Sequence, residues 1–200
     1  DTEANVGLTK HVSTNINPNF TLKSTTKEGG NYQYKIRLQA AHGTSVSNLV
    51  FFDSIENYDP LKADEDYGVK QWRGTLSSID LTHPIMKGID PKVYVSTIPK
   101  LNIEKHNDVT DSSVWKLHKD GDDLSNVQAV AIDLRKNKDG SDFKLAQDTA
   151  INVYLNMKAP WNLKEKQIDP KAKALNAIYA SNTVTTSLDN KSTKLIYTAY

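Results

Sequence analysis

Apolar and polar residues alternate with a period of two along most of this 200-residue chain. The alternation is cleanest over residues 32–38 and 151–157, and it recurs over 71–80, 92–97 and 130–134. Side chains of a β-strand point alternately to its two faces, so this pattern predicts strands with one buried and one exposed face. Turn-forming pairs such as Gly29-Gly30 and Asp139-Gly140 separate these segments.

Helical periodicity is nearly absent, so we expect strands to be the main secondary structure. A short helical turn is expected only within residues 163–176, where Pro160 and Pro170 limit its length. About ten strands with irregular connections predict an all-β fold, an Ig-like β-sandwich with long insertions between strands. Residues 57–70 and 98–125 are polar and poorly periodic, and we expect long loops or small excursions there.

The domain organisation follows from length and continuity. We expect residues 1–200 to form a single elaborated Ig-like domain, because neither part of a division near residue 60 would close a sandwich alone. The strand-like segment 195–200 runs to the last residue, and we expect the chain to be a fragment of a larger protein.

Composition narrows the classes of function. Hydrophobic residues make up 38% and charged residues 24% of the chain, with a net charge of +1. Such a balanced charge gives no electrostatic reason to expect a nucleic-acid partner, and no apolar run is long enough to cross a membrane. The absence of cysteine excludes disulfides and zinc–thiolate sites. We expect no metal and no cofactor.

Three polar residues stand on strand phases that are otherwise apolar. They are Lys10 (between Leu8 and Val12), Asp53 (between Phe51 and Ile55) and Asn176 (before Ile178 and Ala180). Because burying such groups singly is costly, we expect them to meet in the interior. Together they supply the groups for a spontaneous Lys–Asn amide crosslink. Glu56, in the same segment as Asp53, and Asp133, on a third strand, are alternatives for the carboxyl group.

The chemistry of such a crosslink needs a dry site. Burial disfavours the charged forms of both an amine and a carboxyl group, so the amine becomes a nucleophile and the acid a hydrogen-bond donor. Donation to the carboxamide oxygen of Asn176 would polarise its carbon and stabilise the oxyanion. The folded chain supplies the proximity. Each molecule would react once, so the chain is not expected to be an enzyme that turns over.

Several segments resemble a known family. Residues 8–12, 31–38, 46–55 and 174–184 resemble Ig-like modules of Gram-positive surface proteins and pilins, the collagen-adhesin type above all. That resemblance implies an extracellular, cell-wall-anchored location on a Gram-positive bacterium. It also implies that Lys10 is the amine donor, Asp53 the assisting acid and Asn176 the carboxamide acceptor.

We therefore expect a structural stalk or adhesin-supporting domain of a surface protein or pilus, stabilised by a Lys10–Asn176 isopeptide bond. Its partners would be neighbouring domains of the same protein. The alternative is an adhesin module that recognises a host matrix protein or glycan through residues 57–125. A third class is the accessory β-sandwich of a carbohydrate-active enzyme.

Other residue groups are less informative. The histidines are scattered without metal-ligand spacing, and the acidic segments 120–123 and 137–142 are interpreted as polar turns. Trp72, Trp115 and Trp161 are either core residues or a platform for sugar or peptide ligands.

Overall fold

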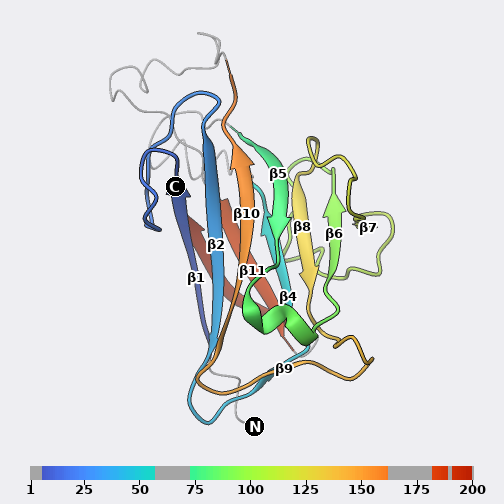
Figure 1. The fold of residues 1–200 in the computed structure, drawn as a ribbon. Coiled ribbons are helices and arrows are strands. Elements are labelled where there is room, and N and C mark those ends of the chain that lie inside the picture. Colours follow the sequence, from blue (N-terminus) through green and yellow to red (C-terminus); the bar gives the residue numbers. More distant parts are fainter. Residues whose placement is uncertain (1–5, 57–72, 162–181, 189–190, 200) are drawn as a thin grey trace.

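The protein is an all-β sandwich in a computed structural model that describes residues 6–56, 73–161, 182–188 and 191–199. One antiparallel sheet has the strand order β1-β2-β10-β5, and the other has the order β12-β11-β4-β8-β6-β7 (Figure 1). A further pair joins β3 to β9. The predicted fold class is therefore confirmed.

The bounds of the elements are as follows: β1 Val6–Thr14, β2 Asn31–Ala40, β3 Val46–Ser47, β4 Val50–Ser54, β5 Thr75–Asp80, η1 Pro84–Gly88, β6 Lys92–Ser96, β7 Lys116–Leu117, β8 Ala129–Asp133, β9 Lys144–Leu145, β10 Ala150–Lys158, β11 Asn182–Leu188 and β12 Lys191–Ala199.

The order of strands is Ig-like with an insertion. In Ig domains one sheet runs A-B-E-D and the other holds C, F and G side by side. Here β1, β2, β10 and β5 take the first set of places, and β4, β11 and β12 take the second. Residues 81–149, between β5 and β10, contribute η1 and the strands β6 to β9, three of which extend the second sheet beyond β4.

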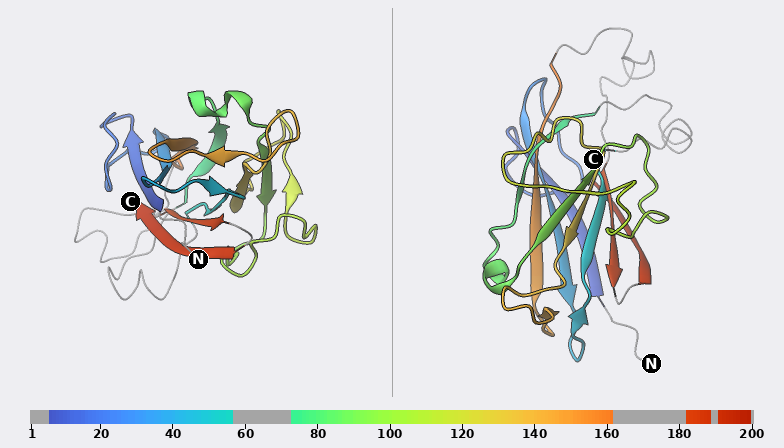
Figure 2. Two further views of the ribbon diagram at one scale, coloured as in Figure 1. Left: turned by 90° about the horizontal axis from the view of Figure 1, so that it is seen from below. Right: turned by 90° about the vertical axis from the view of Figure 1, so that its right-hand side faces the viewer.

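The main core lies between the two sheets, which appear as two layers in Figure 2. It is built from the apolar phase of each strand, for example Tyr34, Ile36 and Leu38 on β2 and Ile151 and Val153 on β10. On one side β1 lies against β12, so the edges of the two sheets meet there. Any polar group on this inner phase is held away from water.

A second, smaller core covers the outer face of the six-stranded sheet. Val50 and Phe52 on β4 contact side chains of the segment after β6, including Leu101 and Trp115. The centres of the Trp115 and Phe52 rings lie 5.7 Å apart, and the indole N–H of Trp115 donates to the carbonyl of His106. The expected excursion at 98–125 is therefore a lid on this sheet.

One sequence expectation needs adjustment at its edge. The strand expected at 71–80 begins only at Thr75, because the groups of Arg73 and Gly74 bond to Ile55 and Glu56 instead. The helical turn expected within 163–176 lies outside the described residues. Among the described residues, no helix is long and apolar enough to cross a membrane. The assignment of all 200 residues to one domain stays a prediction.

Candidate functional site: a buried amine between two carboxyl groups

Lys10 lies inside the sandwich. Its strand β1 buries Leu8, Lys10 and Val12 on one face, and Lys10 pairs with Ile36 of β2. The Lys10 side chain is fully buried, with 0% exposure. A lysine without access to water must find its partners within the protein.

The partner of Lys10 is Asp53, on the facing sheet. The lysine Nζ atom contacts Asp53 Oδ2, and the aspartate is 1% exposed. Asp53 belongs to β4, where Phe51 lies on the same inner phase. The contact thus joins the two layers of the sandwich through two residues that are 43 positions apart in the sequence.

The surroundings favour the neutral amine. Burial lowers the pKa of Lys10, and this effect is opposed by the neighbouring charge of Asp53 and by the hydrogen bond to it. The Lys10 nitrogen also lies 4.7 Å from the centre of the Tyr34 ring. An amine with a lowered pKa can act as a nucleophile, and the carboxylate in contact with it can accept its proton.

Glu56 is a second buried carboxyl group close to this pair. It receives hydrogen bonds from the hydroxyls of Tyr32 and Tyr34, at 2.7–2.8 Å, and from the backbone N–H of Gly74 at 2.7 Å. Burial raises the pKa of Glu56, while these three donors and the charge of Lys10 oppose the rise. Glu56 therefore interacts with Lys10 electrostatically, and Asp53 makes the direct contact.

Backbone conformation explains how Glu56 reaches the interior. Glu56 follows β4 with a φ of 45°, in the left-handed region that non-glycine residues seldom adopt. Strand alternation ends there, so both Ile55 and Glu56 are buried. Such strain persists only where surrounding contacts hold it, and here Tyr32, Tyr34 and Gly74 do so.

Arg73 lies beside this cluster and bonds to the residue before Glu56. It donates to the carbonyl of Ile55 at 2.8 Å and to the side chain of Gln128. Burial lowers the pKa of the half-buried Arg73, and the neighbouring Glu56 opposes the shift. Arg73 thus sets a positive charge near Glu56, at the end of β4.

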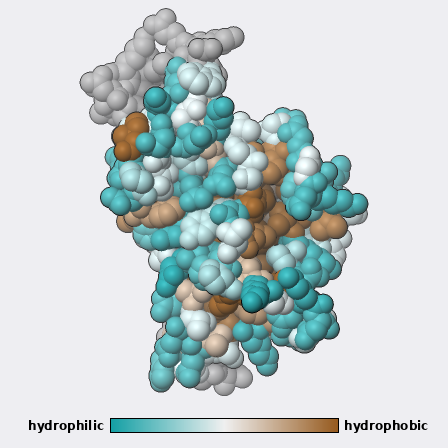
Figure 3. Space-filling view, viewed as in Figure 1, coloured by the Kyte–Doolittle hydropathy of each residue, from teal (hydrophilic) through white to brown (hydrophobic). Residues whose placement is uncertain are grey.

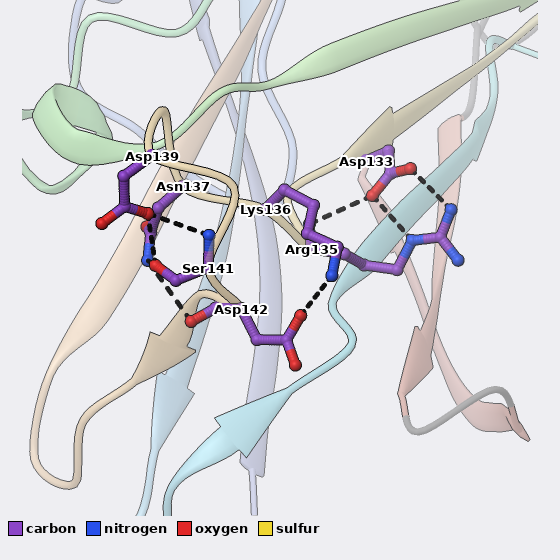
Figure 4. Close-up of polar contacts among 7 residues, drawn as sticks. All are labelled: Asp133, Arg135, Lys136, Asn137, Asp139, Ser141 and Asp142. Carbon is purple, nitrogen blue, oxygen red and sulfur yellow. Dashed lines mark hydrogen bonds and ion pairs between the residues drawn. The ribbon is translucent and has the colours of Figure 1, made fainter.

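Asp133 is not part of the site. It alternates with Ile132, which lies in the main core, and it therefore faces the outer side of the six-stranded sheet. Its carboxylate is bound by Arg135 Nε at 2.9 Å and Nη2 at 2.7 Å (Figure 4). Of the three carboxyl groups considered from sequence, only Asp53 and Glu56 lie near Lys10.

The predicted acceptor, Asn176, lies outside the described residues. The register of the sheet does place another asparagine position near the pair. Val184 of β11 pairs with Asp53 of β4, and Asn182 stands two positions before Val184. Directly paired residues, and residues two apart on a strand, belong to the same face of a sheet. Position 182 therefore belongs to the face that carries Asp53.

The other acidic segments are turns. In the segment 137–142, Asp139 accepts from Ser141 and Asp142 pairs with Lys136, so the turn satisfies its own acidic groups (Figure 4). Within the described parts of the chain, no three histidine or acidic side chains are arranged to hold a metal ion.

Sequence reasoning missed the Tyr32–Tyr34–Glu56 arrangement. A signal was present: both tyrosines stand on the buried phase of a strand, where each hydroxyl needs an acceptor. The sequence pattern offers Glu56 only as an alternative to Asp53.

The site is thus an amine and two carboxyl groups enclosed in a β-sandwich. No family model matches the sequence, and no curated protein matches it. Among solved structures, the chain is similar to the C-terminal domain of the Streptococcus agalactiae AgI/II polypeptide BspA. The TM-score is 0.39 at 10% identity, over 96% of this chain and 48% of that one.

It is also similar to the C-terminal domain of the Streptococcus pyogenes antigen I/II-family protein AspA, with a TM-score of 0.36 at 12% identity. That match covers 96% of this chain and 45% of the other. The chain therefore spans about half the length of these structures. Similarity at this level does not assign the chain to their family.

Proposed function

We propose that this chain is a load-bearing structural domain of a bacterial surface protein, hardened by an amide bond between Lys10 and an asparagine carboxamide. The observation that carries the proposal is the fully buried contact between Lys10 and Asp53, which links the two sheets. A buried ion pair is weak evidence for stability alone, because hydrophobic residues often replace such pairs without loss. The position of the Lys10–Asp53 contact, buried between the two sheets, instead suits a role in forming the amide bond.

The reaction balances without a cofactor. The neutral Lys10 amine attacks the carboxamide carbon, and Asp53 donates a hydrogen bond to the carboxamide oxygen. The C–N bond to the carboxamide nitrogen then breaks, protons shuttled by Asp53 convert that nitrogen to ammonia, and the amide remains. The environment that lowers the Lys10 pKa supports this role.

Two asparagines are candidates for the acceptor. Asn176 is the residue predicted from sequence. Asn182 is supported by register, because it stands two positions from the partner of Asp53. Either bond would close nearly the whole chain into a loop, a constraint worth about 5 kcal/mol in the chain-entropy model. Force that enters near β1 and leaves near β11 would pass through the amide and spare the strands between them.

Intact mass spectrometry tests the proposal. The purified chain is expected to have a mass one ammonia below the sequence value, and Lys10→Ala is expected to have its full sequence mass. Asn176→Ala and Asn182→Ala are matched variants, of which only the acceptor variant should retain its full mass. An unreduced mass of the folded wild-type chain would disprove the crosslink.

The extracellular, cell-wall-anchored location belongs to this proposal, as does the contact with neighbouring domains. The alternative, ligand recognition through residues 57–125, has less support in the described part of that region. Its apolar side chains Leu101, Ile103 and Trp115 pack against the sheet.

A further inference from the structure

The outer face of the four-stranded sheet carries a pocket at one end. The pocket has a volume of about 410 Å³ and lies where β1 ends, β2 begins and β10 ends. The polar residues that line it include Ser13, Asn15, Asn31, Gln33, Ser77 and Asn156. This face is mainly hydrophilic; its largest brown patch lies toward β5 and β8, and smaller ones lie at the upper left and lower centre (Figure 3).

The lining is neutral and rich in amides. No lysine, arginine, aspartate or glutamate is among the residues that form the pocket. Gln33 donates to Asn156 at 2.7 Å, and Asn156 donates to Ser78 at 2.9 Å. Each carboxamide has two N–H donors and an oxygen with two lone pairs, so these bonds orient the amides and leave capacity for a ligand.

An exposed tryptophan stands at the same end of the sheet. Trp161 is 64% exposed, although large aromatic side chains are usually well buried. Its ring lies on Gly29, where a Cβ atom would come within 2.0 Å of the ring. The backbone bonds from Gly29 to Pro160 and from Ala159 to Gly30 hold the two segments together. The ring is thus positioned and still open to solvent.

Backbone contacts connect this ring to the pocket. Asn31, which lines the pocket, follows Gly29 and Gly30 directly, and its carbonyl accepts from the backbone N–H of Asn15. We propose that the pocket and Trp161 form a binding site for a neutral saccharide. Amides and hydroxyls would bond to the sugar hydroxyls, and the fixed indole ring would stack on the apolar face of a sugar ring.

The chain offers a matched pair of variants for the test. Gln33 and Gln39 are on the same strand and the same face of β2, but only Gln33 lines the pocket. Gln33→Ala and Trp161→Ala each remove one element of the site, and Gln39→Ala is the control. Both side chains to be removed are outside the main core, and thermal unfolding verifies that each variant is folded.

The probes are four neutral tetrasaccharides (maltotetraose, cellotetraose, chitotetraose and lacto-N-tetraose), added to the isotope-labelled chain at millimolar concentration. At least one is expected to shift the side-chain amide signals of Gln33 and Asn156. Gln33→Ala or Trp161→Ala should weaken that binding about tenfold, a loss of roughly 1.4 kcal/mol. Gln39→Ala should leave it unchanged.

Failure of all four sugars to shift these signals would overturn the proposal. Equal binding by wild type, Gln33→Ala and Trp161→Ala would also overturn it. A Gly-Ser octapeptide is the competing probe: shifts from the peptide, and none from the sugars, would replace the saccharide assignment with a peptide one. None of these outcomes depends on the crosslink.

Discussion

The nitrogen of Lys10 lies 4.7 Å from the centre of the Tyr34 ring, and the hydroxyl of that ring donates to Glu56 at 2.8 Å. Tyr34 therefore touches the amine with its face and the second carboxyl group with its edge. Because Asp53 contacts the same amine, both buried acids reach Lys10, one directly and one through an aromatic ring. The cluster behaves as a unit, and changes to one member should be felt by the others.

The first prediction concerns the Lys10–Asp53 pair itself. Lys10→Met and Asp53→Leu each leave one buried polar group without its partner, whereas the double variant leaves neither. None of the three variants can form the proposed amide, so their stabilities are directly comparable. The free energy of unfolding, measured with urea, should be higher for the double variant than for the less stable single variant by about 2 kcal/mol or more.

The exposed Lys158→Met, at the end of β10, is the control and should change stability by less than about 0.5 kcal/mol. Strictly additive effects of Lys10→Met and Asp53→Leu would show that the two side chains do not stabilise each other.

The second prediction concerns the hydroxyl of Tyr34. Tyr34→Phe keeps the ring over Lys10 but removes one of the donors to the buried Glu56. The expected cost is about 1–3 kcal/mol in the free energy of unfolding, because a buried carboxyl group loses a bond that water cannot replace. Tyr154→Phe, on the outer face of β10, is the matched control and should cost less than about 0.5 kcal/mol. Equal effects would contradict the bond to Glu56.

Periodicity predicted the parts of the fold that depend on local sequence. Alternation defined β2 and β10 almost completely and put Lys10 and Asp53 on apolar phases. Which strands pair is a non-local property, and no period reveals that β5 joins the sheet of β1 or that β8 lies beside β4.

The site was only partly predictable for a related reason. Glu56 enters the interior because the chain turns at a φ of 45°, beyond the point where alternation applies. The approach of Trp161 to Gly29 is likewise set by a loop and a strand end, which carry no periodic signal. Asp133 was a reasonable candidate from sequence, but the phase of β8 turns it to the opposite face of the sheet.

The third prediction assigns the assisting acid. Under the proposed chemistry, folded Asp53→Ala should retain its full sequence mass, while Asp133→Asn should lose one ammonia as the wild type does. The reason is geometric, since Asp53 contacts Lys10 and Asp133 is bound to Arg135 on the outer face. Near-ultraviolet circular dichroism checks that both variants are folded. Loss of ammonia in Asp53→Ala would remove Asp53 from the mechanism.

The fourth prediction is a pH dependence caused by Glu56, measured in a Lys10→Met background to remove the lysine titration. Burial raises the Glu56 pKa above the ordinary value of 4.5, so the folded state holds this proton at pH values where the unfolded state has released it. The contribution of Glu56 to stability is therefore fully present below pH 4.5 and is lost as the pH rises through the folded-state pKa.

Glu56→Gln in the same background cannot release a proton, and its urea-unfolding free energy should lack this decline. The groups near Glu56 (Asp53, Tyr32, Tyr34 and Arg73) are the same in both variants, so the difference between the two pH profiles reports Glu56 alone. The surface aspartates with lowered pKa values act at lower pH. Parallel pH profiles for the two variants would show that Glu56 does not change its protonation on unfolding.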